Sequence, residues 1–145
     1  GTLNCLEPVT EAMKAQGHGV IAIVGSLAGY VGLTHAGAYC ASKSALMRLA
    51  ETLRAELRGF GVDVRLISPG FVKTPLTDRN DFPMPFLLER DDAVRRIRRG
   101  LDSNRFEIAF PRRLQWSLQL LSVLPKPLYF RALKSMLRDD RKLAK

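Results

Sequence analysis

Three side chains in the first third of the chain have the types and spacing needed for proton transfer at a carbonyl group. Ser26 follows an apolar run, and Tyr39 and Lys43 come 13 and 17 residues later. A separation of four residues puts Tyr39 and Lys43 on one helix face, one turn apart. An isolated phenol has a pKa of about 10, and a neighbouring ammonium favours its ionised form, so Lys43 is expected to adjust Tyr39 for acid–base work. The Ser26 hydroxyl could hold a carbonyl oxygen while charge develops on it.

These groups suit reduction of a carbonyl or oxidation of an alcohol, but none of them can carry a hydride. The chemistry therefore implies a nicotinamide cofactor. Taken singly, each residue has an ordinary structural explanation: a serine at a strand end, and a partly buried tyrosine beside a solvated lysine. The combination is what favours the catalytic interpretation.

The combined pattern resembles the short-chain dehydrogenase/reductase family. The resemblance rests on three segments in the family's order, residues 25–29, 39–43 and 69–74. It implies that Ser26 orients the substrate carbonyl, that Tyr39 transfers the proton, and that Lys43 binds the nicotinamide ribose and adjusts the acidity of the tyrosine. It also implies a set of residues that hold the nicotinamide carboxamide, namely Pro69, Gly70, Val72 and Thr74.

The family's phosphate-binding loop, Gly-x-x-x-Gly-x-Gly after a first strand, does not occur in these 145 residues. The family selects between NAD and NADP in that region, so the cofactor is expected to be NAD or NADP with no choice between them. We expect the chain to correspond to the carboxy-terminal half of such an enzyme. The alternative is a catalytically inactive fragment that acts only as an assembly partner or binding module.

The composition indicates a globular chain that does not span a membrane. Hydrophobic residues make up 46% of the chain, and no apolar run approaches the roughly 18 residues that cross a bilayer. Cys5 and Cys40 are too few for a disulfide framework, which favours a reducing, cytoplasmic setting. His18 and His35 have no metal-ligand spacing with the cysteines, and we assign no metal.

Hydrophobic periodicity predicts an α/β fold, a partial Rossmann-like doubly wound parallel sheet with flanking helices and further helices at the C-terminus. Helices are expected at 2–16, 38–58 and 91–101. Three strands are expected, which the resemblance identifies as the last three of the sheet. The segment 20–24 is a continuous apolar run, typical of a buried parallel strand, and the other two strands are expected at 62–68 and 105–110. Loops are expected at 25–37, rich in glycine, and at 71–90, a mobile segment with a short helix. The family resemblance implies that the segment at 71–90 closes over the substrate.

Proline and glycine predict where the helices end. Pro8 is expected to kink the first helix or to mark its first turn. Gly17 is expected to end that helix, and Gly59 to end the helix at 38–58.

The positive charge is concentrated at the end of the chain. Residues 1–110 carry 14 Lys and Arg against 12 Asp and Glu, whereas residues 111–145 carry 9 against 2. We therefore divide the chain into residues 1–110, the C-terminal half of a Rossmann-type catalytic domain, and residues 111–145, a basic amphipathic helical tail.

Two short helices are predicted in the tail, at 114–124 and 128–137. They either cap the fold and cover the substrate pocket, or lie on an anionic membrane surface, which would favour a lipophilic substrate. Nucleic-acid binding by the basic residues is not expected, because no nucleic-acid-binding motif accompanies them.

A partner chain is also expected. The strand at 20–24 would expose an unpaired hydrophobic edge, so the segment should be poorly stable unless another chain covers that edge. The family resemblance implies a homo-oligomer that pairs through the helices at 2–16 and 38–58.

Overall fold

The computed structural model describes residues 1–75, 77–79 and 83–143. Within these residues the strands form a single parallel sheet in the order β1–β2–β3, with bounds Gly19–Val24, Val62–Pro69 and Glu107–Phe110. The predicted α/β fold with a partial doubly wound sheet is thus confirmed. The last strand begins at Glu107, two residues after the expected start at residue 105.

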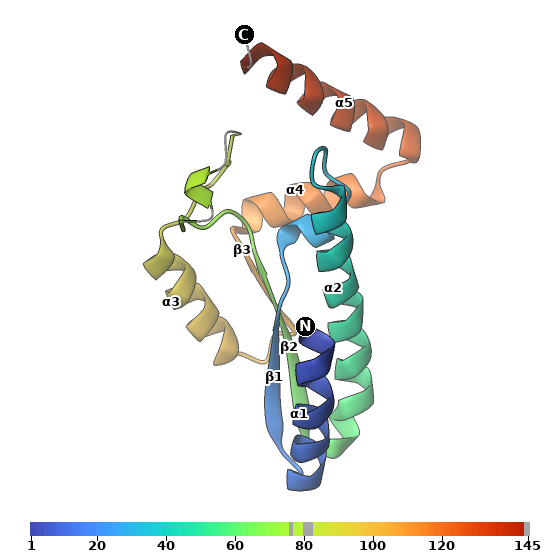
Figure 1. Cartoon of the computed structure of the whole chain (residues 1–145), viewed down its shortest axis with the longest axis vertical. Helices are drawn as coiled ribbons and strands as arrows, with labels where there is room; N and C mark the ends of the chain where they lie inside the picture. Colours follow the sequence, from blue (N-terminus) through green and yellow to red (C-terminus); the bar gives the residue numbers. More distant parts are fainter. Residues whose placement is uncertain (76, 80–82, 144–145) are drawn as a thin grey trace.

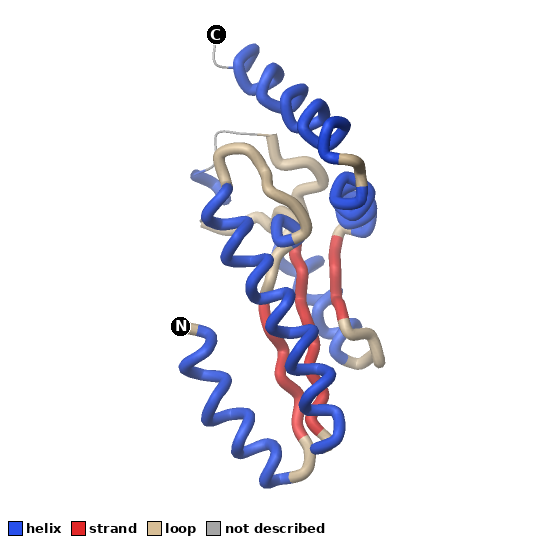
Figure 2. Tube along the Cα trace, turned by 90° about the vertical axis from the view of Figure 1, so that its right-hand side faces the viewer, coloured by secondary structure: helices blue, strands red, loops and turns tan. Residues whose placement is uncertain are grey.

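Helices cover both faces of the sheet (Figures 1 and 2). α1 (Thr2–Gln16) and α2 (Gly37–Leu57) lie on one face, and α3 (Arg90–Leu101) lies on the other. On the α2 side, Met47 and Ala50 pack with residues of β1 and β2. On the α3 side, Ala93 packs with Ile67 and Ile108. β2 is therefore buried along most of its length on both faces. The continuous apolar run at 20–24 predicted the same for β1, and this prediction is wrong for the described residues, where β1 alternates between buried and exposed positions.

β1 is less well covered than β2. Within the described residues it pairs only with β2, and its residues alternate between buried and exposed. Ile21 and Ile23 face the α1 and α2 layer, whereas Val20 and Val24 are exposed on the other face. The described part of the molecule thus leaves one edge and half of one face of β1 open.

Two of the predicted helix boundaries need correction. α2 ends at Leu57 and continues as a 3₁₀ turn, and the glycine with left-handed backbone is Gly61, not Gly59. A Cβ at Gly61 would lie 2.1 Å from the main-chain oxygen of Gly17, so close chain approach also requires glycine there. Pro8 lies inside α1 and not in its first turn. The Gly17 prediction is confirmed by its left-handed cap.

A buried arginine ties the end of α3 to the sheet. Arg65 of β2 is 7% exposed, and its guanidinium donates to the main-chain oxygens of Gly100, Ser103 and Arg105 while pairing with Asp63. The hydrogen-bond donors of this buried charged side chain are thereby satisfied by the turn that leads into β3.

The tail forms helices α4 (Arg112–Val123) and α5 (Lys126–Leu143), so α5 is longer than predicted. Leu118 of α4 and Tyr129 of α5 pack with Leu27 and Val31, and the Tyr129 hydroxyl donates to the main-chain oxygen of Gly32 at 2.7 Å. One face of the tail therefore caps the carboxyl end of the sheet (Figure 1). No helix in the described ranges is long and apolar enough to cross a bilayer.

Part of the loop expected at 71–90 has regular main-chain structure. Val72 and Leu88 form a parallel bridge, and Thr77–Arg79 form a 3₁₀ turn. Residues 76 and 80–82 of this prediction lie outside the described residues.

Candidate active site

The predicted site residues lie at the carboxyl end of the parallel sheet. Ser26 comes two residues after the end of β1, Pro69 ends β2, and Tyr39 and Lys43 lie in the first turns of α2. In open α/β sheets, ligands bind in the crevice at this end of the strands. The topology alone thus brings together segments that are far apart in the sequence.

Ser26 is held by the backbone on both sides. It has extended φ and ψ and caps the 3₁₀ turn Leu27–Gly29, where its Oγ accepts from the main-chain N–H of Ala28 at 3.2 Å. The same Oγ donates to the main-chain oxygen of Pro69 at 3.4 Å. The hydroxyl is therefore fixed between the ends of β1 and β2, and it is nearly buried.

Tyr39 and Lys43 are adjacent, as their spacing predicted. The Lys43 ammonium lies 5.7 Å from the centroid of the Tyr39 ring and donates to the main-chain oxygen of Val24 at 3.3 Å. The Tyr39 side chain is 51% exposed. The phenol can therefore be reached by a ligand while a positive charge lies beside it.

Close packing of the 3₁₀ turn on α2 fixes the serine segment against the lysine. A Cβ at Gly29 would lie 2.5 Å from Met47 Sδ and 3.0 Å from the main-chain carbon and oxygen of Lys43. Only glycine permits this approach without movement of the backbone of α2.

Internal hydrogen bonds shape the segment after β2. Gly70 N–H donates to the main-chain oxygen of Phe110 at 2.7 Å, and Thr74 N–H donates to Thr77 Oγ1 at 2.8 Å. Thr77 Oγ1 in turn donates to the main-chain oxygen of Val72 at 2.9 Å. By contrast, Val72 N–H has no acceptor among the described residues. Of the four predicted contact residues, Val72 is thus the one that retains a main-chain donor for a ligand.

A second polar cluster behind the serine turn was not predicted. Glu107 Oε1 accepts from the Tyr30 hydroxyl at 2.7 Å and from Ser68 Oγ at 2.5 Å, and Gln115 Nε2 donates to the Tyr30 hydroxyl at 3.3 Å. Burial, reinforced by the hydrogen bond to Glu107 and its charge, raises the pKa of Tyr30 above its ordinary value. The cluster joins the turn after β1 to β2, β3 and α4. Its sequence signal is weak, because Ser68 and Glu107 are simply polar residues within predicted strands.

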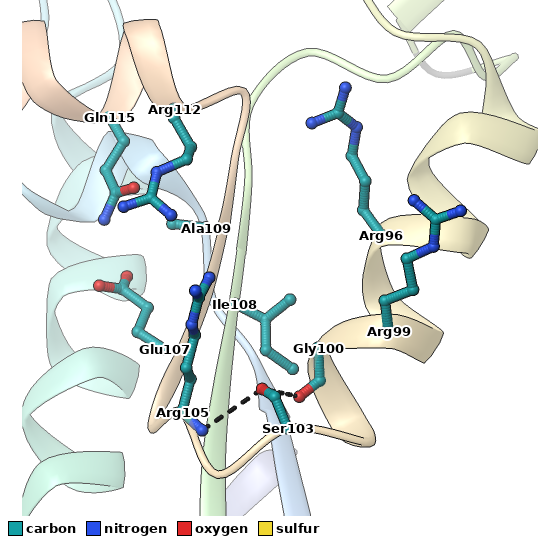
Figure 3. A pocket seen from close by; sticks show the side chains of 10 residues that line it. All are labelled: Arg96, Arg99, Gly100, Ser103, Arg105, Glu107, Ile108, Ala109, Arg112 and Gln115. Carbon is teal, nitrogen blue, oxygen red and sulfur yellow. Dashed lines mark hydrogen bonds between the residues drawn. The ribbon is translucent and has the colours of Figure 1, made fainter.

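A separate cavity of about 560 Å³ lies between α3, β3 and the start of α4 (Figure 3). Its charged lining is mainly basic, from Arg96 and Arg99 on α3 and from Arg105 and Arg112 on the opposite side. None of the predicted catalytic residues lines it. It is therefore distinct from the Ser26–Tyr39–Lys43 arrangement.

The donors at the carboxyl end of the sheet fit part of a nicotinamide nucleotide. The exposed Tyr39 phenol and the Lys43 ammonium are suited to ribose hydroxyls, and the Val72 N–H is suited to a carboxamide oxygen. Ser26, held on the neighbouring strand end, offers a hydroxyl for a substrate oxygen.

The chain is similar in sequence to known proteins. Residues 1–82 match the family described as short chain dehydrogenase. An uncharacterised oxidoreductase from Myxococcus xanthus is 43% identical over 129 residues, which cover 89% of this chain and 51% of that protein. A vibriobactin-specific 2,3-dihydro-2,3-dihydroxybenzoate dehydrogenase from Vibrio cholerae is 38% identical over 76 residues, which cover 52% of this chain and 29% of that protein.

A solved structure is similar over nearly the whole chain. A short chain dehydrogenase from Burkholderia cenocepacia, solved in complex with NADP, superposes with a TM-score of 0.77 at 30% identity, over 91% of this chain and 54% of that one. The present chain spans about half the length of the Myxococcus and Burkholderia proteins.

Proposed function

Because this chain belongs to the short-chain dehydrogenase family, we propose that it carries the proton-transfer and substrate-orienting residues of an oxidoreductase that uses NAD or NADP. The reaction is reduction of a carbonyl or oxidation of an alcohol. The observation that supports it most directly is the placement of Lys43 between the Tyr39 ring and the end of β1.

Each side chain has one role in this proposal. Ser26 Oγ donates to the substrate oxygen, exchanging its 3.4 Å bond to Pro69 for a bond to the ligand. Tyr39 donates a proton to that oxygen during reduction, or accepts it during oxidation. Lys43 stabilises negative charge on the phenol oxygen and binds a ribose hydroxyl of the coenzyme.

The nicotinamide ring is the group that supplies or accepts the hydride in this chemistry. In this chain, the residues that would hold it are Lys43, Tyr39 and the segment of Pro69, Gly70, Val72 and Thr74. The carboxamide contact is assigned to Val72 N–H, because Gly70 N–H and Thr74 N–H already have acceptors. Binding of NADP by the Burkholderia relative favours testing NADP first, with NAD as the alternative.

The proposed partner is a second copy that packs against α1 and α2. Leu3 and Val9 of α1 are exposed apolar residues, and a helical contact that covers them would remove them from water. The alternative, a binding or assembly module without activity, predicts the same contact but no turnover.

The experiment that tests the proposal is a Tyr39→Phe substitution in a full-length protein that carries this chain together with a phosphate-binding loop. NADPH and NADH oxidation is measured with a panel of aldehydes and ketones. Loss of the proton donor should lower kcat by roughly 10²- to 10⁴-fold while coenzyme binding persists.

Tyr129→Phe is the matched control, since it removes the hydroxyl of a tail residue, which donates to the main-chain oxygen of Gly32. Its kcat should stay near that of the wild type. Turnover by Tyr39→Phe at the wild-type rate would refute the assignment, and no turnover by the wild type with any carbonyl compound would favour the inactive alternative.

A further inference from the structure

α4 has two apolar faces, and the fold uses only one of them. The buried face packs against the turn after β1 through Leu114, Leu118 and Leu121. On the opposite face, Trp116, Leu120 and Val123 are 57%, 65% and 74% exposed. At 3.6 residues per turn, these three exposed residues lie within roughly 60° of the helix circumference. We call them the apolar stripe.

The stretch of chain that contains the apolar stripe carries only basic charges. Residues 108–138 contain six Lys and Arg and no Asp or Glu. Arg112 and Arg113 precede the stripe, Lys126 follows it, and the Arg112 guanidinium lies 5.5 Å from the centroid of the Trp116 ring. A contiguous exposed apolar surface with a basic border requires an explanation beyond solvation of single residues.

We propose that the apolar stripe and its basic border bind the surface of a bilayer that contains anionic phospholipid. Helices that lie in the plane of the interface bury an apolar face at the depth of the acyl boundary and keep cationic residues at the headgroups. Tryptophan is enriched at that depth, and each nearby Lys or Arg is attracted to anionic lipid. The order Arg113, Trp116, Leu120, Val123 and Lys126 along the chain matches this arrangement.

The charge distribution argues against a second copy of this chain as the occupant of the stripe. A symmetric contact through the stripe would bring the same basic border to both sides. No carboxylate between residues 108 and 138 is available to pair with it. Like charges facing each other oppose association, whereas anionic lipid neutralises them.

Docking in this way would also orient the proposed active site. The buried face of α4 and Tyr129 of α5 contact residues 27–32, which lie between Ser26 and Tyr39 in the chain. The carboxyl end of the sheet would therefore lie close to the lipid, where a lipophilic alcohol or carbonyl compound is concentrated. This last step rests on the proposed function, whereas the lipid contact does not.

The test uses the full chain and vesicles of phosphatidylcholine alone or with one third phosphatidylglycerol. Trp116 is the only tryptophan of the chain, so its emission reports directly on the stripe. We expect co-sedimentation and a blue shift of the emission with the anionic vesicles, and little of either with phosphatidylcholine alone or in high salt.

The variant that probes the stripe is Leu120→Ser with Val123→Ser, which retains Trp116. The partition coefficient should fall by roughly tenfold or more, because the apolar contact is lost. Leu101→Ser with Val94→Ser on α3 is the matched control, with the same substitutions at exposed positions away from the stripe. Circular dichroism verifies that both variants fold.

A second variant, Arg113→Gln with Lys126→Gln, tests the basic border without changing the apolar residues. It should bind the anionic vesicles less tightly and leave the weak binding to phosphatidylcholine unchanged. Absence of wild-type binding, or equal losses in the stripe and control variants, would overturn the proposal. So would a stripe variant that binds vesicles normally but dissociates an oligomer in analytical ultracentrifugation. All these readouts are independent of turnover.

Discussion

The Lys43 ammonium donates a 3.3 Å hydrogen bond to the main-chain oxygen of Val24, the last residue of β1. This bond joins the start of α2 to the strand end that leads to Ser26. It also orients the lysine so that its charge lies beside the Tyr39 ring. In the proposed function, one side chain therefore has both a positioning and an electrostatic role.

Replacing Lys43 with methionine should affect coenzyme binding and turnover together. The variant loses a charged hydrogen-bond donor, which should weaken NADPH binding by roughly 10- to 100-fold, and kcat should fall as well. Fluorescence titration and steady-state kinetics measure the two effects in the full-length protein. Lys73→Met is the control, because Lys73 is exposed and pairs with Glu89. Normal coenzyme binding by Lys43→Met would contradict the role assigned to this residue.

Gly29→Ala should disturb the active site through packing. The added methyl group would press on Met47 and on the backbone of Lys43, which should lower the free energy of unfolding by about 1–3 kcal/mol. Gly37→Ala is the control, since a Cβ there meets no atom within 4 Å and the residue begins α2. Urea unfolding compares the two variants. Equal stabilities would mean that the turn can move away from α2 at little cost.

The raised pKa of Tyr30 predicts a loss of stability in alkaline solution. Burial and Glu107 keep the folded phenol protonated, whereas the phenol of the unfolded chain ionises near pH 10. The stabilisation is therefore complete below about pH 10 and decreases as the pH rises towards the folded value. Tyr30→Phe should cost about 1.5–3 kcal/mol at pH 7 through the lost bond to Glu107.

The difference between the wild type and Tyr30→Phe should become smaller above pH 10. Urea unfolding of both proteins at neutral and alkaline pH measures it. A constant or growing difference would show that Tyr30 ionises at least as readily in the folded chain as in the unfolded chain.

Arg65→Met should loosen the turn between α3 and β3. The substitution leaves the main-chain oxygens of Gly100, Ser103 and Arg105 without their buried donor, at a cost of about 3 kcal/mol. Hydrogen exchange should increase first in α3 and β3. Arg95→Met is the control, since Arg95 forms an exposed pair with Asp92 and its loss should cost no more than about 0.5 kcal/mol. Similar exchange in both variants would contradict the anchoring role of Arg65.

Periodicity predicted the elements that position the site. The predictions for α1 and β2 lie within about one residue of the observed bounds. For α1 the apolar repeat carries the prediction, because burial of one helix face dictates its composition. The adjacency of Tyr39 and Lys43 followed from helical spacing alone. The proximity of Ser26 and Pro69 is a finding of the structure, in which the parallel order of β1 and β2 brings the two residues together.

Long-range polar contacts were not predictable from the sequence. The partners Tyr30 and Glu107 are 77 residues apart, and no local pattern connects them. The left-handed residue after α2 was predicted as Gly59 and is Gly61. The sequence around α2 does not reveal this, because the glycine is required by the close approach of the main chain at Gly17, the residue that caps α1. In both cases the determining contact is between segments distant in the sequence.

The described residues leave one edge of β1 without a neighbouring strand, and a sheet can be divided into two polypeptides at such an edge. A strand laid against that edge would gain ladder hydrogen bonds, whether or not it is covalently joined to this chain. A separate polypeptide that supplies such a strand would associate by mass action, so the stability of the pair would increase with concentration. If the proposed function holds, such a pair would be a split enzyme, in which recovery of activity reports that two separately expressed pieces have met.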